Sequence, residues 1–363
     1  MLRTAILPSP PVANTTERSG GYTYIAASVS GFLTRLFISC GGIILLCFFG
    51  IAGLYAQVPQ KGISAHDPVI IKQDSIYYIF CTGRGINCWS STDMLNWKKE
   101  KSVFSVAPHW TDSVVPGFKN HIWAPDIFYY NNRYYLFYSV SAFGKNTSAI
   151  GVAVNKTLYP FAADYRWEDK GIVIRSIPGK TNFNAIDPNV IVANGQPYLS
   201  FGSFWKGIML VKLSDDLLRI ADDEEIMNIA SRKTFSKDTL LMNGSGNAIE
   251  APYIFRKGKY YYLFASTDYC CKGKESTYKV IVGRSESIEG PYKDQDGKLL
   301  LQGGGTIVIK GNDEWYAAGH NAVASFEGQD YIVFHGYDAA DIGKPKLQIK
   351  KLSWDKKGWP FIK

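Results

Sequence analysis

Five stretches of this chain share one alternation of apolar and polar positions. Each reads as an apolar strand, a short polar turn and a second strand rich in aromatic residues. The stretches are Ile122–Phe137, Ile186–Phe201, Ile249–Phe264 and the slightly shorter His66–Phe80 and His320–Phe334. The turns carry residues that favour tight hairpins, such as Asn194-Gly195. The stretches recur about every 60 residues, which indicates stacked supersecondary units.

A further apolar strand follows in each unit, and residues 66–352 contain no amphipathic helix longer than about three turns. Strand after strand with radial repetition predicts an all-β chain folded as a five-bladed β-propeller. The alternative is a two-sheet sandwich, but sandwiches do not repeat at this period. The sequence does not say which strand closes the ring between the first and last blades.

The second positions of the five stretches carry the candidate chemistry. They are Asp67, Trp123, Asp187, Glu250 and Asn321. If the units surround an axis, these positions face one centre and three of them place a carboxyl group there. A single Asp before Pro is commonly a turn residue. Three acids in register are costly unless they have a chemical role.

Two carboxyl groups on either side of a bond are the arrangement used for glycoside hydrolysis. One protonates the leaving oxygen and the other activates water. A third carboxylate nearby raises the pKa of the acid by like-charge repulsion. Glu250 has the longest of the three side chains and is the better candidate for the proton donor.

Aromatic residues are abundant, with 9 Trp, 23 Tyr and 20 Phe. Trp123, Phe143 and Trp205 are candidates for stacking against sugar rings. For any single aromatic residue, packing in the core is the alternative. Trp123 differs from the others because it occupies an axial position.

The N-terminal region has a different character. Residues 37–54 are apolar and end in Leu54-Tyr55-Ala56, a pattern typical of a secretory signal peptide. An uncleaved membrane anchor is the alternative. We therefore expect an N-terminal extension with signal peptide over 1–56 and one catalytic domain over 57–363. The protein is expected to be exported, whether secreted, periplasmic or at the cell surface.

The formal net charge of +8 is spread along the chain without a cluster of Lys or Arg, which argues against a nucleic-acid partner. We expect a monomer. Cys81 and Cys88 flank a short turn, whereas Cys270 and Cys271 are adjacent. Disulfides and free thiols both remain open for these four, and their spacing does not match a zinc site.

Several motifs in order resemble those of glycoside hydrolase family 43, and in particular its arabinan endo-1,5-α-L-arabinosidases. The matching segments span nearly all of 66–360. They are His66–Pro68, His121–Asp126, Tyr138–Gly144, Ile186–Asn189, Gly202–Trp205, Ile249–Pro252 and Gly319–Asn321.

This resemblance implies an inverting enzyme in which Asp67 is the general base, Glu250 the general acid and Asp187 the residue that tunes the acid. It also implies that Trp123 and Phe143 line the substrate groove. His320 matches a histidine beside a metal ion, often calcium, in the central channel. No organic cofactor is expected.

The implied substrate is α-1,5-linked arabinan, as found in pectin side chains, or its oligosaccharides. The resemblance favours endo action. Exo-acting α-L-arabinofuranosidase or β-xylosidase activity on the same fold is the first alternative. A non-catalytic carbohydrate-binding propeller is the remote one, and it would have no need for three intact acids.

Overall fold

The computed structural model describes residues 62–235, 241, 243–244 and 246–363. The expected signal peptide or anchor in residues 37–54 lies outside these residues. Gln57–Lys363 forms one compact unit. Within its described part, no helix is long and apolar enough to cross a membrane.

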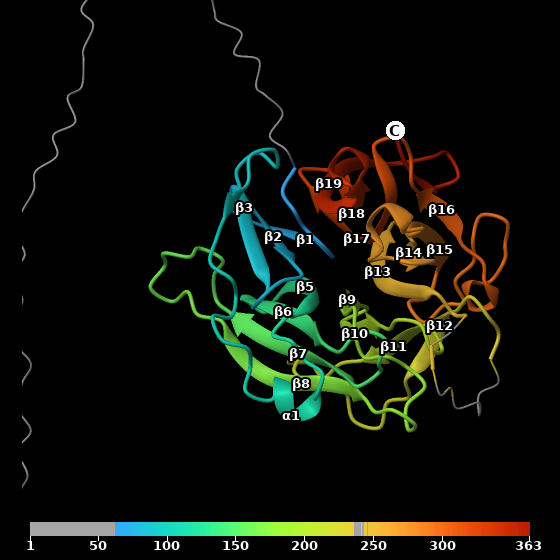
Figure 1. Ribbon diagram of the computed structural model, residues 1–363. Coiled ribbons are helices and arrows are strands. Elements are labelled where there is room, and N and C mark those ends of the chain that lie inside the picture. Colours follow the sequence, from blue (N-terminus) through green and yellow to red (C-terminus); the bar gives the residue numbers. More distant parts are fainter. Residues whose placement is uncertain (1–61, 236–240, 242, 245) are drawn as a thin grey trace, which may run out of the picture. The chain divides into compact units, whose positions relative to one another are not determined.

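In the described part of the chain, twenty strands form five antiparallel four-stranded sheets arranged around a centre, which confirms the predicted five-bladed propeller (Figure 1). Blade 1 contains β1 (Val69–Gln73), β2 (Ile76–Cys81), β3 (Asn87–Ser91) and β4 (Lys98–Lys99). Blade 2 contains β5 (Trp123–Tyr130), β6 (Arg133–Val140), β7 (Ser148–Asn155) and β8 (Glu168–Ser176). Blade 3 contains β9 (Asn189–Ala193), β10 (Gln196–Phe201), β11 (Ile208–Lys212) and β12 (Met227–Ala230).

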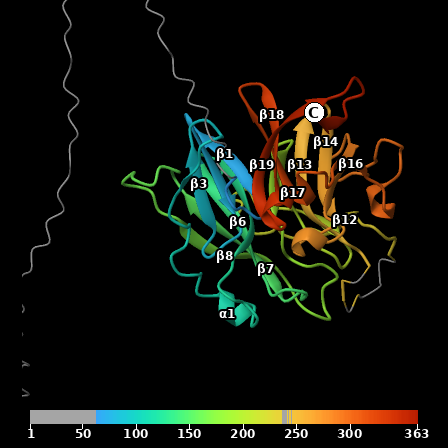
Figure 2. The same ribbon diagram turned by 45° about the horizontal axis from the view of Figure 1, so that its top comes forward.

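Blade 4 contains β13 (Ile249–Lys257), β14 (Tyr260–Thr267), β15 (Lys279–Ser285) and β16 (Thr306–Ile309). Blade 5 contains β17 (Trp315–Phe326), β18 (Gln329–Asp338), β19 (Lys344–Trp354) and β20 (Pro360–Ile362). The short helices are α1 (Thr111–Val114), η1 (Gly273–Glu275), η2 (Leu300–Gln302) and η3 (Ala339–Asp341). Helix α1 lies at the outer edge of the ring, beside β7 and β8 (Figure 2).

The hydrophobic core is divided among the five interfaces between blades. Side chains alternate sides along a strand, so successive residues of each second strand face opposite neighbours. In β6, Leu136 packs toward blade 1 and Phe137 toward blade 3. In β14, Leu263 and Phe264 do the same toward blades 3 and 5. This explains why the aromatic strand of each repeat is apolar at consecutive positions.

The ring closes without exchanging a strand between its first and last blades, since each blade is built from consecutive strands. The segment before β1 instead pairs with β19. Ser64 forms a bridge with Lys346, and the Leu347 N–H donates to the Ile63 carbonyl at 3.0 Å. This answers the question of closure that the sequence left open.

A left-handed residue begins the inner end of every blade. These residues are Asp67, Ala124, Asp187, Ala251 and His320, with φ between 43° and 60°. The register read from the sequence is therefore correct in blades 1 and 3 but one residue off at Trp123, Glu250 and Asn321. The cause is a bulge at this point in β5, β13 and β17, where an irregular residue count shifts the register.

Each left-handed residue donates its backbone N–H to a side chain of the preceding blade. The acceptors are Thr82 Oγ1 for Ala124, Ser139 Oγ for Asp187, Asp187 Oδ2 for Ala251, Ser266 Oγ for His320 and His335 Nδ1 for Asp67, at 2.8–3.1 Å. Three of these acceptors are hydroxyls two residues after the last Phe of a repeat. These bonds join all five blades around the axis.

We predict that Ser139→Ala lowers the free energy of unfolding by about 1–3 kcal/mol, because the buried Asp187 N–H loses its acceptor. Urea unfolding would measure the change. Ser105→Ala, at an exposed position, is the control and should change the free energy by less than about 0.5 kcal/mol. Equal effects of the two substitutions would contradict a role for this bond in joining the blades.

Candidate active site

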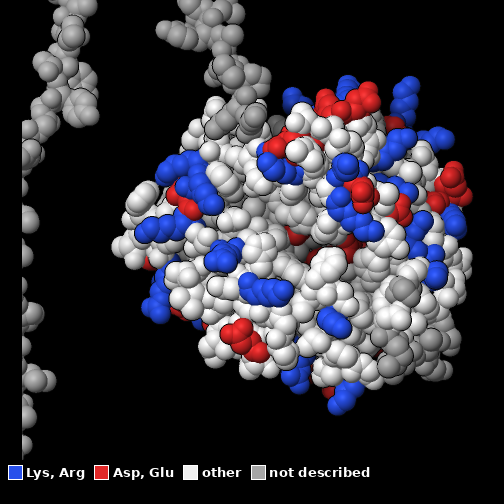
Figure 3. Space-filling model, viewed as in Figure 1, with Lys and Arg blue, Asp and Glu red and all other residues white. Residues whose placement is uncertain are grey.

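A cleft of about 1070 Å³ opens at the inner ends of the blades. Figure 3 shows acidic side chains at the bottom of a hollow in the middle of this face. All seven site residues predicted from the sequence line the cleft: Asp67, Trp123, Phe143, Asp187, Trp205, Glu250 and His320. The structure therefore brings together residues from all five blades.

Asp67 is buried and heavily hydrogen-bonded. Its Oδ1 lies 2.8 Å from His66 Nδ1 and 3.0 Å from His320 Nδ1. Its Oδ2 accepts a hydrogen bond from the Thr82 hydroxyl at 2.5 Å. Burial raises the pKa of Asp67, but the charges and hydrogen bonds of His320 and His66 lower it by more. The resulting pKa lies well below the usual value for an aspartate. Asp67 is therefore ionised at neutral pH and able to accept a proton.

Asp187 and Glu250 are two neighbouring carboxyl groups at the cleft. Burial, with the charges of Glu250 and Asp67, raises the pKa of Asp187 to about 8. Burial and the Asp67 carboxylate also raise the pKa of Glu250. Glu250 Oε2 accepts a hydrogen bond from Ser203 Oγ at 2.7 Å, and the Tyr278 hydroxyl also hydrogen-bonds Glu250; both contacts lower its pKa. Since the two carboxyls resist ionising together, the pair retains a proton under conditions in which Asp67 has none.

His320 is the cation at the centre of the three acids. Burial lowers its pKa, but Asp67, Asp187 and Glu250 raise it, and the net value is about 9. At neutral pH the ring is therefore an imidazolium that partly compensates the acids. An imidazolium has no free lone pair, and calcium prefers oxygen ligands. The donors around His320 do not fit direct calcium binding, so a calcium ion stays a prediction and no chemical step is assigned to it.

One further group among the described residues has the composition of a metal site: His66, Asp67 and His335. His335 Nδ1, however, already accepts the Asp67 N–H at 3.1 Å. Burial and the neighbouring His66 lower the pKa of His335 well below its usual value, so the ring is neutral. We interpret this group as structural support for Asp67.

The three predicted aromatic residues differ in availability. Phe143 is 81% exposed and can stack freely on a ligand. Trp123 is partly buried beside the acids. Trp205 is only 7% exposed, and its buried Nε1 has no hydrogen-bond partner among the described residues. Trp205 therefore presents a small edge to the cleft rather than an open face.

Sequence reasoning missed four supporting residues. These are His66, Thr82, Ser203 and Tyr278, all in contact with Asp67 or Glu250. His66 and Ser203 lie inside motifs already noted, so their position was a usable signal. Thr82 and Tyr278 reach the site only through the packing of strands, for which the sequence gives no local signal.

The four cysteines of the described region behave differently from one another. Cys81 and Cys88 are buried free thiols, and the strand register pairs Cys88 with Phe80 rather than with Cys81. Cys270 and Cys271 form a disulfide between neighbouring residues, and both line the cleft.

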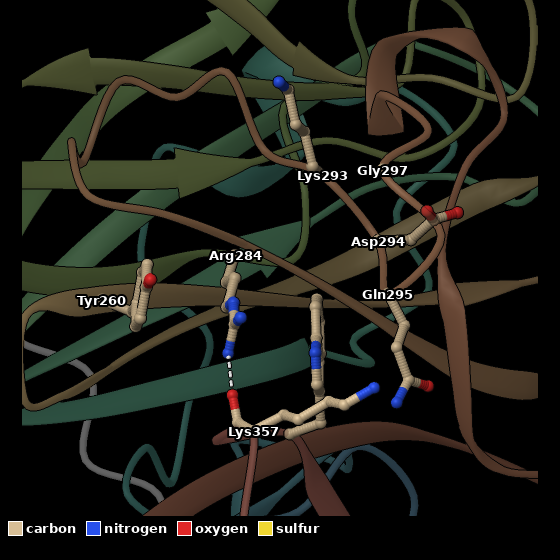
Figure 4. A pocket seen from close by; sticks show the side chains of 8 residues that line it. Tyr260, Arg284, Lys293, Asp294, Gln295, Gly297 and Lys357 are labelled. Atoms are coloured by element: carbon tan, nitrogen blue, oxygen red, sulfur yellow. Dashed lines mark hydrogen bonds between the residues drawn. The ribbon is translucent and has the colours of Figure 1, made fainter.

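A second cavity of about 440 Å³ shares no residue with the cleft. Arg284 lies between the rings of Tyr260 and Trp359, 4.3 Å from each centroid, and donates to the Lys357 carbonyl at 2.7 Å (Figure 4). Asp294 is the single acid of its lining, and it accepts backbone N–H groups. This cavity lacks the paired carboxyls that hydrolysis requires.

Comparison with known proteins supports the reading of the cleft. The sequence model described as glycosyl hydrolases family 43 matches residues 58–360. An extracellular exo-α-(1→5)-L-arabinofuranosidase of Cellvibrio japonicus is 51% identical, with 83% of this chain and 87% of that relative covered. An extracellular endo-α-(1→5)-L-arabinanase of Bacillus subtilis is 43% identical over 81% and 86% of the two chains.

Solved structures of arabinanases are also similar to this chain. The α-L-arabinanase of Cellvibrio cellulosa in complex with arabinohexaose has a TM-score of 0.81 and 49% identity, covering 84% of this chain and 96% of that one. The family 43 endo-arabinanase of Bacillus licheniformis has a TM-score of 0.74 and 45% identity, covering 82% and 97%.

We predict that His320→Gln raises the pKa of Asp67, because a neutral amide replaces the imidazolium that holds this carboxyl ionised. Carbon NMR of the Asp67 carboxyl across a pH titration would measure the shift. His109→Gln, at an exposed position, is the matched control and should leave it unchanged. An Asp67 pKa that does not move in His320→Gln would mean that other partners hold it low.

Proposed function

Because the chain belongs to the glycosyl hydrolases of family 43, we propose that it cleaves α-1,5-L-arabinofuranosidic bonds within arabinan chains. One observation carries this function. An ionised carboxylate and a carboxyl pair that retains a proton face the same cleft, on a fold shared with arabinanases. The protein is a glycoside hydrolase, and arabinan or its oligosaccharides are its substrate.

The mechanism assigns one role to each acid. Asp67 removes a proton from a water molecule, which attacks the anomeric carbon. Glu250 gives its proton to the departing glycosidic oxygen as the bond breaks. Attack from the face opposite the leaving group inverts the anomeric configuration, as expected for a base and an acid separated by a water molecule.

Glu250 suits the role of acid better than Asp187. It is partly exposed and reaches the cleft with a longer side chain, whereas Asp187 is 6% exposed and accepts the Ala251 N–H. When Glu250 loses its proton, the hydroxyls of Ser203 and Tyr278 stabilise the resulting anion. Burial and the nearby Asp67 carboxylate raise the pKa of Glu250, which favours its protonated form before the reaction.

The shape of the cleft supports endo action. At about 1070 Å³ it is slightly larger than the usual ligand site and has room for several sugar units. Phe143 and Trp123 provide aromatic surface along it. Exo action is the second candidate, because the 51% identical relative is named an exo-acting arabinofuranosidase.

An extracellular location fits this substrate, a polymer of pectin side chains too large to enter a cell. Two relatives are named extracellular, in agreement with the apolar segment at 37–54. Monomeric state and calcium binding remain predictions.

We predict that linear arabinan releases a mixture of arabino-oligosaccharides early in the reaction, because an endo enzyme cuts at internal bonds. Reducing-end assays and chromatography of the products would measure this. Glu250→Gln, which cannot donate the proton, should lower the rate by about 100-fold or more. Release of one small product from the start would establish the exo mode, and near-normal activity of Glu250→Gln would refute its assignment as acid.

We also predict that the pH profile of kcat/KM is bell-shaped and that Asp187→Asn moves its alkaline limb to lower pH. The charge of Glu250 raises the pKa of Asp187, and such repulsion acts on both groups, so removing the Asp187 carboxyl is expected to lower the pKa of Glu250. The acid then loses its proton earlier as pH rises. The acidic limb should move less, because His320 and His66 remain beside Asp67. An unmoved alkaline limb would leave Asp187 only a role in binding substrate.

A further inference from the structure

The disulfide between Cys270 and Cys271 has no role in the mechanism above, although it lines the cleft. Both residues lie between β14 and η1. Cys271 is exposed and has a left-handed backbone, with φ of 68°. Cys270 is partly buried. The disulfide is therefore held in place through the partly buried Cys270 and is accessible from the cleft at Cys271.

Cys271 contacts the residues that hold the general base. Its Sγ lies 3.8 Å from His66 Nε2, and its backbone N–H donates to the Tyr337 hydroxyl at 2.7 Å. The same hydroxyl lies 3.2 Å from His66 Nε2. The other ring nitrogen of His66 is 2.8 Å from Asp67 Oδ1. The orientation of His66 is thus set on its outer side by Cys271 and Tyr337.

Cys270 lies beside the cluster that contains a residue hydrogen-bonded to the general acid. It packs against a buried cluster of Tyr278, Ala317 and Tyr337. Tyr278 hydrogen-bonds Glu250. One short covalent bond therefore joins the support of the base, through Cys271 and His66, to the support of the acid, through Cys270 and Tyr278.

We propose that the Cys270–Cys271 disulfide is a positioning element for both Asp67 and Glu250, and that its reduction by a dithiol slows turnover. The inference rests on the proposed function for its kinetic readout. In the reduction, the S–S bond breaks and two S–H bonds form. The dithiol supplies two electrons and two protons and becomes a cyclic disulfide.

The other thiols of the described region do not compete with this response. Cys81 and Cys88 are buried, and burial raises the pKa of both, so they stay protonated and unreactive. The groups that face Asp67 are His66, His320, His335 and Thr82, and those around Glu250 are Asp187, Asp67, His320, Ser203 and Tyr278. Of these, His66 contacts Cys271, and Tyr278 belongs to the cluster against which Cys270 packs.

The test compares the oxidised full-length protein with the same protein treated with dithiothreitol, the loss of the bond being verified by mass spectrometry. We expect kcat on linear arabinan to fall about tenfold, because small displacements of catalytic groups carry large costs. KM should change much less, and reoxidation should restore the rate. Both limbs of the pH profile should move to higher pH, since loosening His66 and Tyr278 raises the pKa of Asp67 and of Glu250.

Two variants complete the experiment. The double variant Cys270→Ser with Cys271→Ser should have the kcat and pH profile of the reduced enzyme, and dithiothreitol should not change them. Cys81→Ser with Cys88→Ser should keep the full response. If either pair fails to fold, the reduced and reoxidised natural chain still provides the comparison. A reduced enzyme with unchanged kcat and unchanged pH limbs would overturn the proposal.

Failure of the proposed function is distinguishable from failure of this inference. An oxidised protein with no activity on arabinan would refute the function alone. Carbon NMR titration of Asp67 and Glu250 then reports positioning without any substrate. Carboxyl pKa values that rise on reduction would support the inference, and identical values in the two redox states would refute it.

Discussion

The five N–H groups at the axis constrain the rest of this molecule. Each blade begins with a left-handed residue, and each of these residues donates its N–H to a side chain of the blade before it. A left-handed conformation is costly for residues other than glycine and persists only where surrounding contacts hold it. Here the contacts between blades do so, and they fix the inner strand ends to within hydrogen-bonding distance of one another.

This constraint places the chemistry. Asp67, Asp187 and His320 are themselves left-handed residues, and Glu250 immediately precedes another, Ala251. Their side chains converge because the backbone that carries them is held in a ring. Asp187 has two tasks, since its N–H is bound by Ser139 and its carboxylate receives the Ala251 N–H. Closure of the fold and assembly of the active site therefore use the same atoms.

Three acids can be buried beside one another here because their neighbours shift their pKa values in opposite directions. His320 and His66 compensate Asp67, which stays ionised, whereas burial and neighbouring carboxylates raise the pKa values of Asp187 and Glu250. Acid and base functions at one pH follow from this asymmetry. The site needs no side chain of unusual intrinsic acidity, only unequal neighbours.

The sequence by itself determined the repeat, the number of blades and the three acids, because alternation of apolar residues and the chemistry of carboxyl groups are local properties. It misplaced the axial register at Trp123, Glu250 and Asn321, because a bulge changes the residue count without changing the apolar pattern. Only the tertiary structure showed that Thr82 and Tyr278 support the acids and that Trp205 is mostly covered. It also showed that Cys271 contacts His66 while Cys270 packs against the cluster that includes Tyr278. These contacts join residues from different blades, and distances between blades are set by packing around the ring rather than by neighbours in the chain.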